Sequence, residues 1–321
     1  MGEFDLIARY FTRPARRSPL GVGDDCALLQ PRAGMQLAVS TDLLIEGRHF
    51  LSTVDPARLG HKALAVNLSD LAACGAEPLA FTLSLALPRV DEPWLAAFSA
   101  GLLALADAHA CELVGGDTTR GPLAINITVF GEVPAGQALL RSGARAGDDL
   151  WISGTLGDAR LALDAFRGLV SLPQDVFDPA RLRLETPQPR VALGLALRGI
   201  ATSAIDISDG LLGDLRHVLQ QSGVGATVDS APACTLLAAA RGAWAIERER
   251  IEELVFAGGD DYELAFTAPP DRQEAVQAAS ARSGTPVTRI GVIESQPGLR
   301  VIGADGRTLA RRFAGFDHFG P

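Results

Sequence analysis

Lysine is nearly absent from this 321-residue sequence, which contains one lysine, Lys62, beside 28 arginines. A phosphate-binding loop of the form G-x-x-x-x-G-K-[ST] needs a lysine, and the protein-kinase motifs need a strand lysine and an H-R-D loop. Lys62 follows His61 within an expected helix and belongs to neither motif. Nucleotide-binding proteins with this loop and protein kinases are therefore both excluded. If the chain handles nucleotide phosphates, cations held by aspartate must do most of the neutralising, with arginine assisting.

Cysteine is also scarce. The sequence contains Cys26, Cys74, Cys111 and Cys234, with no C-x-x-C pair and no nearby histidine at zinc-finger spacing. A zinc or disulfide framework is therefore not expected. Most of these cysteines are expected to be small buried side chains.

Long apolar runs and excess positive charge are missing as well. The richest apolar stretch, residues 79–87, has the length of a strand, whereas a membrane helix needs roughly 18 residues. The N-terminal residues carry acids where a signal peptide would carry bases. The 38 acidic and 29 basic residues give a net charge of −9, which is a poor match for nucleic acid or anionic lipid. We expect a cytoplasmic protein with no membrane and no nucleic-acid partner.

The composition is that of a folded, two-domain chain. Hydrophobic residues make up 47% and charged residues 21% of a chain longer than the usual single domain. A polar stretch at 136–149 is the expected boundary, which gives domains of residues 1–136 and 137–321. Strands are expected at 35–39, 81–87, 124–130, 150–153, 204–207, 262–267 and 291–293, and helices within 1–18 and at 56–75, 93–109, 158–166, 190–198 and 210–221. Both halves mix strands and helices, so the expected class is α/β or α+β.

Aspartate is abundant, at 24 residues against 14 glutamates, and it clusters beside glycine, serine and threonine. The clusters are Gly23-Asp24-Asp25, Ser40-Thr41-Asp42, Gly115-Gly116-Asp117-Thr118, Asp206-Ile207-Ser208-Asp209-Gly210 and Gly258-Gly259-Asp260-Asp261. Each alone is more often a turn than a ligand site. Adjacent aspartates repel each other unless cations share the site, and short carboxylates on tight turns suit Mg²⁺. We expect these clusters at strand ends or on short loops, and we expect them to converge in space around magnesium.

Asp70 is the sharpest single case. Helical spacing places it within roughly 40° of Leu59, Ala63 and Val66, on the apolar face of its helix. A buried lone carboxylate is disfavoured, so it should be paired or metal-bound. Asn67 shares this face and adds an oxygen ligand or a donor. Two interpretations stay open: a metal ligand, or a carboxylate satisfied by arginine or backbone amides.

The second half offers a similar arrangement. Asp206 and Ser208 alternate onto one side of their strand, and Ser208 and Asp209 occupy the N-cap position of the next helix. We expect a capped helix in either case. In the functional interpretation, Asp206 and Asp209 also point from the strand end into a cleft, where metal and phosphate could meet the helix dipole.

Eight segments follow one another along the chain: GVGDDCALL (21–29), STDLLIEGRHF (40–50), KALAVNLSDLAACGA (62–76), GGDTTRGPL (115–123), LLRSGARAGD (139–148), SAIDISDGLLGDL (203–215), AGGDDYEL (257–264) and GFDHF (315–319). Together they resemble the thiamine-monophosphate kinase family, within the superfamily of aminoimidazole ribonucleotide synthetase and selenophosphate synthetase. The resemblance implies ATP-dependent phosphorylation of thiamine monophosphate to thiamine diphosphate, with several Mg²⁺ ions and a homodimer. It implies a ferredoxin-like N-terminal domain for ATP, magnesium and dimer contacts, and an α/β C-terminal domain that completes the phosphate and substrate site.

The resemblance also assigns residues. The positions that match metal ligands are Asp25, Ser40, Thr41, Asp42, Asp70, Asp117, Asp206 and Asp209. Those that match nucleotide contacts are Gly116, Asp117, Arg141 and Ser208, and those that match thiamine contacts are His49, Asp260 and Phe316. The expected catalytic residues are Asp42, Asp70, Asp117 and Arg141, the arginine steadying the transferring or leaving phosphates. The family often has glutamate at Asp260 and a larger or hydroxylated aromatic residue at Phe316.

Two other functions stay open at this point. One is an ATP-using relative from the same superfamily with an oxygen or selenium acceptor, although Cys26 follows an aspartate pair and no glycine-rich segment with a reactive cysteine precedes it. The other is a non-catalytic dimeric scaffold that binds metal or nucleotide, against which the complete set of carboxylates argues.

Overall fold

The computed structural model describes residues 2–242, 244–311 and 313. The chain divides into two compact units. The N-terminal unit consists of Met1–Leu71 and Ala76–Gly136, and the C-terminal unit of Ala72–Gly75 and Gln137–Pro321. The division falls beside Gly136, where the polar stretch of the sequence begins.

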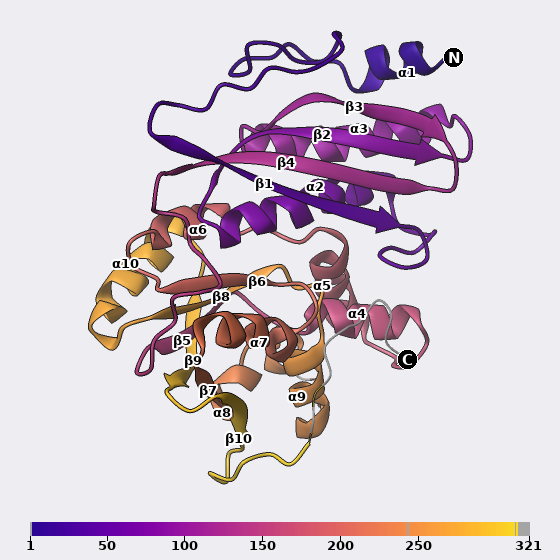
Figure 1. Ribbon diagram of the computed structural model, residues 1–321. Helices are drawn as coiled ribbons and strands as arrows, with labels where there is room; N and C mark the ends of the chain where they lie inside the picture. Colours follow the sequence, from indigo (N-terminus) through magenta and orange to yellow (C-terminus); the bar gives the residue numbers. More distant parts are fainter. Residues whose placement is uncertain (1, 243, 312, 314–321) are drawn as a thin grey trace. The chain divides into compact units, whose positions relative to one another are not determined.

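A four-stranded sheet forms the centre of the N-terminal unit (Figure 1). The elements are α1 (Glu3–Tyr10), β1 (Met35–Ile45), α2 (Pro56–Ala73), β2 (Glu77–Leu87), α3 (Glu92–Ala108), β3 (Glu112–Arg120) and β4 (Ala124–Pro134). The strand order is β1-β4-β2-β3, with β4 antiparallel to both neighbours and β2 parallel to β3. β1, α2 and β2 thus form a split β-α-β unit with β4 in between. The whole order, β-α-β-α-β-β with β2 and β3 adjacent and parallel, differs from the β-α-β-β-α-β order of ferredoxin-like domains, so the expected ferredoxin-like topology is not confirmed.

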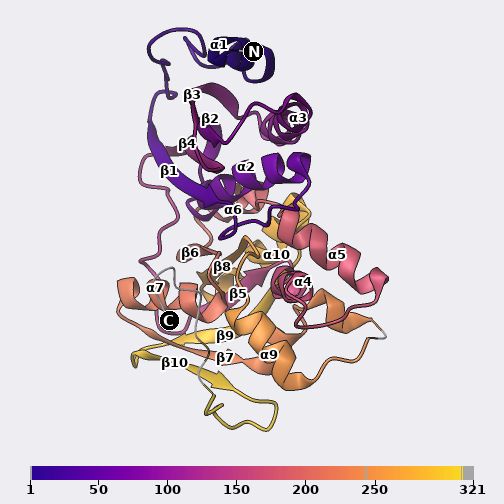
Figure 2. The ribbon, with the colours of Figure 1, turned by 90° about the vertical axis from the view of Figure 1, so that its right-hand side faces the viewer.

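Helices α2 and α3 pack together on one face of this sheet (Figure 2). A Cβ at Gly60 would lie 2.1 Å from a carbonyl oxygen of α3, and one at Gly101 would lie 1.9 Å from a carbonyl oxygen of α2. The helices therefore touch backbone to backbone, which any side chain at these two positions would prevent. The expected start of α2 is confirmed, since Arg58 N donates to Asp55 Oδ1 at 3.1 Å.

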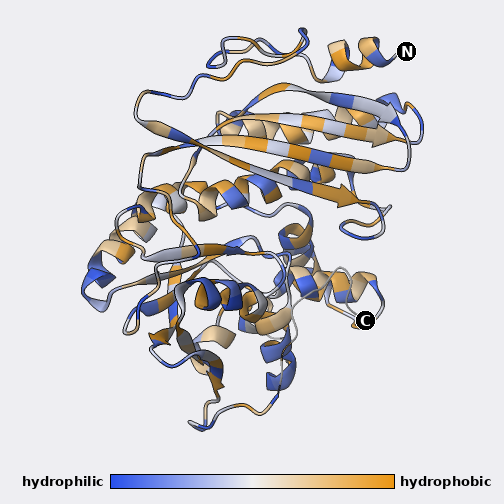
Figure 3. Ribbon diagram, in the orientation of Figure 1, coloured by the Kyte–Doolittle hydropathy of each residue, from blue (hydrophilic) through white to orange (hydrophobic). Residues whose placement is uncertain are grey.

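The other face of β1 carries exposed aliphatic side chains. Leu37, Val39, Leu43 and Ile45 are 43%, 57%, 49% and 41% exposed, and much of β1 is coloured hydrophobic in Figure 3. We call these four residues the β1 outer face. Large hydrophobic side chains that gather on one surface mark interaction sites more often than plain solvent-facing surface.

A six-stranded sheet organises the C-terminal unit, in the order β10-β7-β9-β5-β8-β6. The elements are β5 (Asp149–Ser153), α4 (Asp158–Phe166), α5 (Gln174–Glu185), α6 (Val191–Leu197), β6 (Ser203–Ile207), α7 (Leu211–Ser222), β7 (Gly225–Asp229), α8 (Ser230–Cys234), η1 (Ala238–Arg241), α9 (Arg248–Ala257), β8 (Glu263–Ala268), η2 (Pro270–Arg272), α10 (Gln273–Ser283), β9 (Val287–Glu294) and β10 (Gly298–Ile302). Its main core joins Ile152 of β5, Ile207 of β6 and Phe256 of α9. The mixed α/β class with two sheets is confirmed.

Two aspartate clusters lie inside strands, where the sequence places them at strand ends or on loops. β1 continues through Ser40-Thr41-Asp42 to Ile45, and Gly115-Gly116-Asp117 lies within β3. Pairing with neighbouring strands extends both elements, because ladder hydrogen bonds outweigh the weak strand preference of aspartate and glycine. Sequence reasoning also missed α5, whose interior contains Pro179, a residue that argues against a helix.

No helix in the described ranges has the length and hydrophobicity needed to cross a membrane. Cys111 and Cys234 are buried, whereas Cys26 and Cys74 are exposed, and all four are free thiols. The expectation that most cysteines are buried is therefore correct for two of the four.

Candidate active site

The first group of candidate residues lies between β1 and α2. Ser40 and Asp42 alternate along β1 on the side of α2, and Ser40 Oγ donates a hydrogen bond of 2.5 Å to Asp70 Oδ2. Burial, followed by the charge of Asp70, raises the pKa of Asp42 to about 7. Asp70 faces the sheet, as its helical spacing predicts. Two carboxylates that repel one another in a partly buried place would be relieved by a cation.

Asn67 adds an unusual feature to this group. It is 1% exposed and its Nδ2 donates to Ala63 O at 3.1 Å, while its Oδ1 has no hydrogen-bond partner within the described part of the chain. A buried oxygen without a donor is costly, and this one lies one helical turn before Asp70. Carboxylate, hydroxyl and amide oxygens are the kinds of ligand that Mg²⁺ prefers.

The second group lines a cavity of about 650 Å³ on the N-terminal unit. Asp25, Gly116 and Asp117 all contribute to its wall. Gly116 has a φ of +147°, and a Cβ there would lie 1.8 Å from Leu83 O. Only glycine fits there, because any side chain would collide with the backbone of β2.

These two groups are separate in the N-terminal unit. Asp42 and Gly116 lie in one row across the sheet, three strands apart, which corresponds to about 14 Å at the usual strand spacing. Asp117 is in the row of Leu43, on the face that also carries Thr41, whereas Asp42 faces the helices. Among the residues that the structure describes, no group of three or more His, Cys, Asp or Glu is placed to hold a metal ion. The described carboxylates thus do not form one ready-made metal cage.

The third group lies in the C-terminal unit, at the end of β6. Asp206 is 7% exposed, and the loop that follows is held by Asp214, whose carboxylate accepts from Ser208 N and Asp209 N, both at 3.0 Å. Burial raises the pKa of Asp214 to about 7. The N-cap of α7 is Gly210, without a side-chain cap. The expected capping by Ser208 or Asp209 is therefore wrong, because a carboxylate within the first turn of α7 reaches back to their amides instead.

Asp260 is fixed against the same loop. Asp260 N donates to Ser208 O and Tyr262 N donates to Ile207 O, both at 2.8 Å, and Tyr262 Oη donates to Asp260 Oδ1 at 3.2 Å. Both Asp260 and Tyr262 have left-handed backbones, with φ of 60° and 51°. Such conformations cost free energy in residues other than glycine and persist where surrounding bonds impose them. The structure therefore brings Asp260 to the loop of residues 206–209.

Sequence reasoning missed the residues that hold Asp260 in place. Asp261 is 1% exposed and accepts from Gly157 N at 2.9 and 3.1 Å, and burial raises its pKa well above the usual range. Arg183 Nη2 donates to Asp261 O at 3.1 Å and to Glu263 Oε1 at 2.7 Å. Glu263 is fully buried and also pairs with Arg190 at 2.5 Å. The Asp260-Asp261 pair is visible in the sequence, but the residues that bind it and Glu263 lie about 70 to 105 residues away. No local sequence pattern therefore shows that Asp261 is the buried, structural member of the pair.

Three other candidates lie outside these groups. His49 is in the loop after β1, where its Nδ1 accepts from Ile45 N at 3.0 Å. Arg141 is an exposed residue of the C-terminal unit, and its carbonyl accepts from Ser222 Oγ at 3.2 Å. Phe316 lies outside the described residues.

Known proteins resemble both units. Residues 23–133 match the model of the AIR synthase related protein, N-terminal domain, and residues 145–304 match the corresponding C-terminal domain. The chain is 46% identical to the thiamine-monophosphate kinases of Salmonella typhimurium strain LT2 and of Escherichia coli strain K12. Both alignments cover 99% of this chain and 98% of the relative.

Solved structures agree with these matches. The crystal structure of thiamine-monophosphate kinase from Stenotrophomonas maltophilia K279a superposes with a TM-score of 0.84 at 45% identity, covering 95% of this chain and 96% of that one. A structure described as AaThiL complexed with AMPPCP and TMP gives 0.76 at 30% identity, over 90% and 89% of the two chains. Fold and family models together define an AIR synthase related protein of two domains. Within that class, the chain belongs to the thiamine-monophosphate kinase family.

Proposed function

We propose that this chain transfers the terminal phosphoryl group of ATP to the phosphate of thiamine monophosphate, giving thiamine diphosphate and ADP. The observation that carries the proposal is the 46% identity to thiamine-monophosphate kinases over 99% of the chain. The 30% identical structure with AMPPCP and TMP supports the same pair of substrates. The direct test is to incubate the purified protein with Mg²⁺, ATP and thiamine monophosphate. Thiamine diphosphate and ADP are expected in equal amounts, and a failure to form either would contradict the proposal.

The proposed metal ions are Mg²⁺, held by the oxygen-rich groups described above. The proposed ligands are Asp25, Ser40, Thr41, Asp42, Asp70, Asp117, Asp206 and Asp209. When bound, such cations would neutralise two polyanions whose mutual repulsion is the main obstacle to in-line transfer. The acceptor needs no general base, because the second pKa of a phosphate monoester lies near 6. The proposed task of this chain is therefore to position two anions.

The remaining proposed roles follow from chemistry and position. Gly116 and Asp117 bind nucleotide in the cavity of the N-terminal unit that they line, and Ser208 and Arg141 add contacts to phosphate oxygens. Asp260, with His49 and Phe316, binds the thiamine part. The proposed catalytic set is Asp42, Asp70, Asp117 and Arg141. In this proposal residues 1–136 serve ATP, magnesium and dimer contacts, residues 137–321 complete the phosphate and substrate site, and the enzyme works in the cytoplasm.

The exposed thiols offer a test of where the nucleotide binds. Cys26 lines the cavity with Asp25 and Gly116, whereas Cys74, also exposed, does not. We expect Mg-ATP at ten times its Kd to slow alkylation of Cys26 about tenfold and to leave Cys74 unchanged. Cys234 should react slowly at pH 7.5 with or without ligand, because burial raises its pKa to about 11. Mass spectrometry of the labelled peptides gives the rates, and unprotected Cys26 would place the nucleotide elsewhere.

We further propose a homodimer in which a second copy covers the β1 outer face. The supporting observation is the row of four exposed aliphatic side chains along β1. Replacing Val39 and Leu43 together by glutamate should raise the dimer Kd at least about 100-fold, since each buried aliphatic side chain contributes roughly 1.5 to 3 kcal/mol. Leu169→Glu, at a leucine 69% exposed in the C-terminal unit, is the matched control. Sedimentation velocity measures the effect, and a double variant as dimeric as the control would contradict this interface.

A further inference from the structure

The segment from Asp260 to Tyr262 has an uncommon backbone. Among the described residues other than glycine, three have a positive φ, and two of them are Asp260 and Tyr262, at 60° and 51°. Aspartate enters the left-handed region at little cost because its short polar side chain can hydrogen-bond locally, but a bulky residue such as tyrosine is an outlier there. Strain of this kind persists only where surrounding bonds impose it, and it clusters at functional sites.

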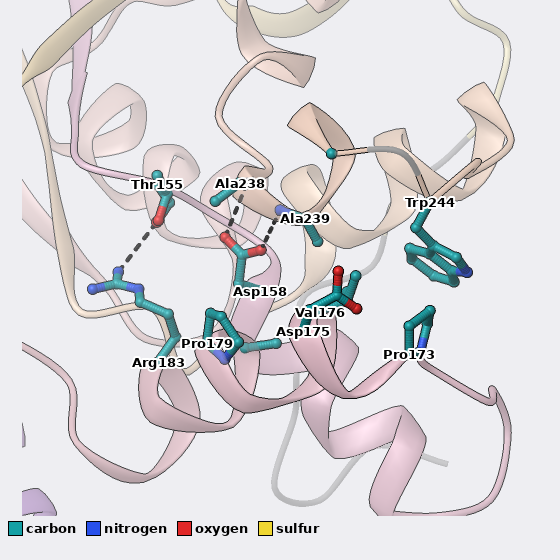
Figure 4. A pocket seen from close by; sticks show the side chains of 12 residues that line it. Thr155, Asp158, Pro173, Asp175, Val176, Pro179, Arg183, Ala238, Ala239 and Trp244 are labelled. Atoms are coloured by element: carbon teal, nitrogen blue, oxygen red, sulfur yellow. Dashed lines mark hydrogen bonds between the residues drawn. The ribbon is translucent and has the colours of Figure 1, made fainter.

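Hydrogen bonds on two sides impose this backbone. On one side, two amides of the segment donate to carbonyl oxygens at the end of β6, as described above. On the other side, Gly157 N donates to the Asp261 carboxylate at 2.9 Å. Arg183 Nη2 donates to Asp261 O at 3.1 Å and to Thr155 O at 3.2 Å, and Figure 4 shows the second of these bonds. The backbone of Asp260 therefore has a fixed place, and the direction of its carboxylate depends on its two side-chain torsions.

The hydroxyl of Tyr262 restricts those torsions. Tyr262 Oη donates to Asp260 Oδ1 at 3.2 Å, and a bond to one carboxylate oxygen also decides where the other oxygen points. The tyrosine is partly buried and stands directly before β8, whose first residue, Glu263, is fully buried. A hydrogen bond to a charged acceptor is roughly twice as strong as one between neutral groups. The hydroxyl is thus an anchored donor that holds the carboxylate in one orientation.

We propose that Tyr262 is a positioning residue, which holds the Asp260 carboxylate in the orientation that receives the cationic part of thiamine monophosphate. This inference rests on the proposed function, in which Asp260 binds the thiamine part, and it adds the residue that acts through Asp260. A carboxylate that rotates freely must be ordered when the substrate binds, and this ordering weakens binding. Loss of the hydroxyl should therefore weaken binding of the acceptor and leave phosphoryl transfer between bound substrates unchanged.

Tyr262→Phe is the first test, because phenylalanine keeps the ring and removes only the hydroxyl. We expect the KM for thiamine monophosphate to rise about fivefold. Both kcat and the KM for ATP should stay within about a factor of two of wild type, because the lost interaction is the same in the ground state and the transition state. Tyr10→Phe is the matched control: Tyr10 is the other tyrosine of the sequence, in α1, and its hydroxyl donates to Glu92 O at 3.5 Å. It should leave all three constants unchanged, and thermal unfolding checks that both variants fold.

A double variant shows whether Tyr262 acts through Asp260. Asp260→Gly removes the carboxylate and accepts the left-handed backbone without strain. Adding Tyr262→Phe to Asp260→Gly should change the KM for thiamine monophosphate by less than about twofold, because residues that act as one unit are not additive. A further fivefold rise in the double variant would overturn the inference, since the hydroxyl would then act independently of Asp260.

Calorimetric titration with unphosphorylated thiamine gives a readout that does not need turnover. Tyr262→Phe should bind thiamine about fivefold more weakly than wild type does. Unchanged thiamine binding together with an unchanged KM for thiamine monophosphate would overturn the inference and leave the proposed function standing. Equal losses of kcat and of ATP affinity would also overturn it, because they would show a merely structural role. If the wild type binds thiamine through Tyr262 but forms no thiamine diphosphate, the proposed function fails while the inference stands.

Discussion

Asp42→Asn is expected to lower the rate of thiamine diphosphate formation by at least about 10³-fold, since a carboxylate that holds a catalytic cation contributes several kcal/mol to the transition state. Asparagine keeps the size of the side chain and the fold but removes the charge. Asp107→Asn, at an exposed aspartate of the same unit that pairs with Arg13, should keep full activity. Steady-state assays at saturating Mg²⁺ measure both. If Asp42→Asn keeps more than a tenth of wild-type activity, Asp42 does not hold a catalytic cation.

The same substitution should stabilise the metal-free protein at alkaline pH. Burial and Asp70 raise the pKa of Asp42 from 3.8 to about 7, so in the folded state the charged form is disfavoured. Protonated Asp42 therefore contributes to the stability of the folded protein. This contribution is fully present below about pH 4 and is lost as the pH rises through about 7. At pH 8 in EDTA, Asp42→Asn should therefore unfold with a free energy up to about 2 kcal/mol higher than wild type, after allowance for solvent screening.

Urea unfolding at pH 5 and pH 8 tests this relation. The advantage of Asp42→Asn should shrink at pH 5, where nearly all of the Asp42 in the folded wild type is protonated. At pH 8, Mg²⁺ should stabilise wild type more than the variant. A variant that is less stable than wild type at both pH values would show that the Asp42 charge is already compensated inside the protein. Loss of activity with a gain of stability is the signature that separates a ligand carboxylate from a structural one.

Local chemistry in the sequence predicted much of the fold. The start of α2 at Asp55-Pro56 is confirmed by the hydrogen bond from Arg58 N, and α4 begins and ends at Asp158 and Phe166 as expected. Element bounds failed where pairing between distant segments decides them, as in β1, which continues through Asp42 because the whole strand pairs with β4. Contacts between segments far apart in the sequence also decide which face of each sheet the helices cover. They likewise decide that one row of aliphatic residues on β1 stays exposed and that the helices touch at Gly60.

In the candidate site, too, local features could be predicted from the sequence, whereas features that depend on distant segments could not. Helical spacing was enough to predict that Asp70 lies on the face of α2 that packs on the sheet, where Ser40 donates a hydrogen bond to it. It could not foresee that α7 would begin at Gly210 without a side-chain cap, while Asp214 in its first turn accepts from the loop amides of Ser208 and Asp209. Both the loop and this turn carry carboxylates, and only the backbone path decides which of them makes these bonds. Nor could spacing place the three groups relative to each other, since they come from different elements of two separately packed units.

The buried ion cluster at Glu263 carries the largest expected effect on stability. Glu263 is fully buried, accepts from Ser153 Oγ at 2.6 Å and pairs with Arg183 and Arg190. Glu263→Ala leaves two guanidinium groups in a low-dielectric place without their counter-charge, which costs about 3 to 5 kcal/mol of folding free energy. The melting temperature should fall by about 10 °C, given the entropy of unfolding of a unit of this size.

Two further variants show whether the loss of charge or the loss of side-chain volume destabilises Glu263→Ala. Glu253→Gln removes a carboxylate 40% exposed that pairs with Arg250, and it should change the free energy of unfolding by less than about 1 kcal/mol. Adding Arg190→Met to Glu263→Ala removes one of the stranded charges, so the double variant should be more stable than Glu263→Ala alone. Chemical unfolding of the full-length chain measures all three. If Glu263→Ala costs no more than the control, the cluster does not hold the C-terminal unit together, and the position of Asp260 must depend on the loop at Ser208 instead.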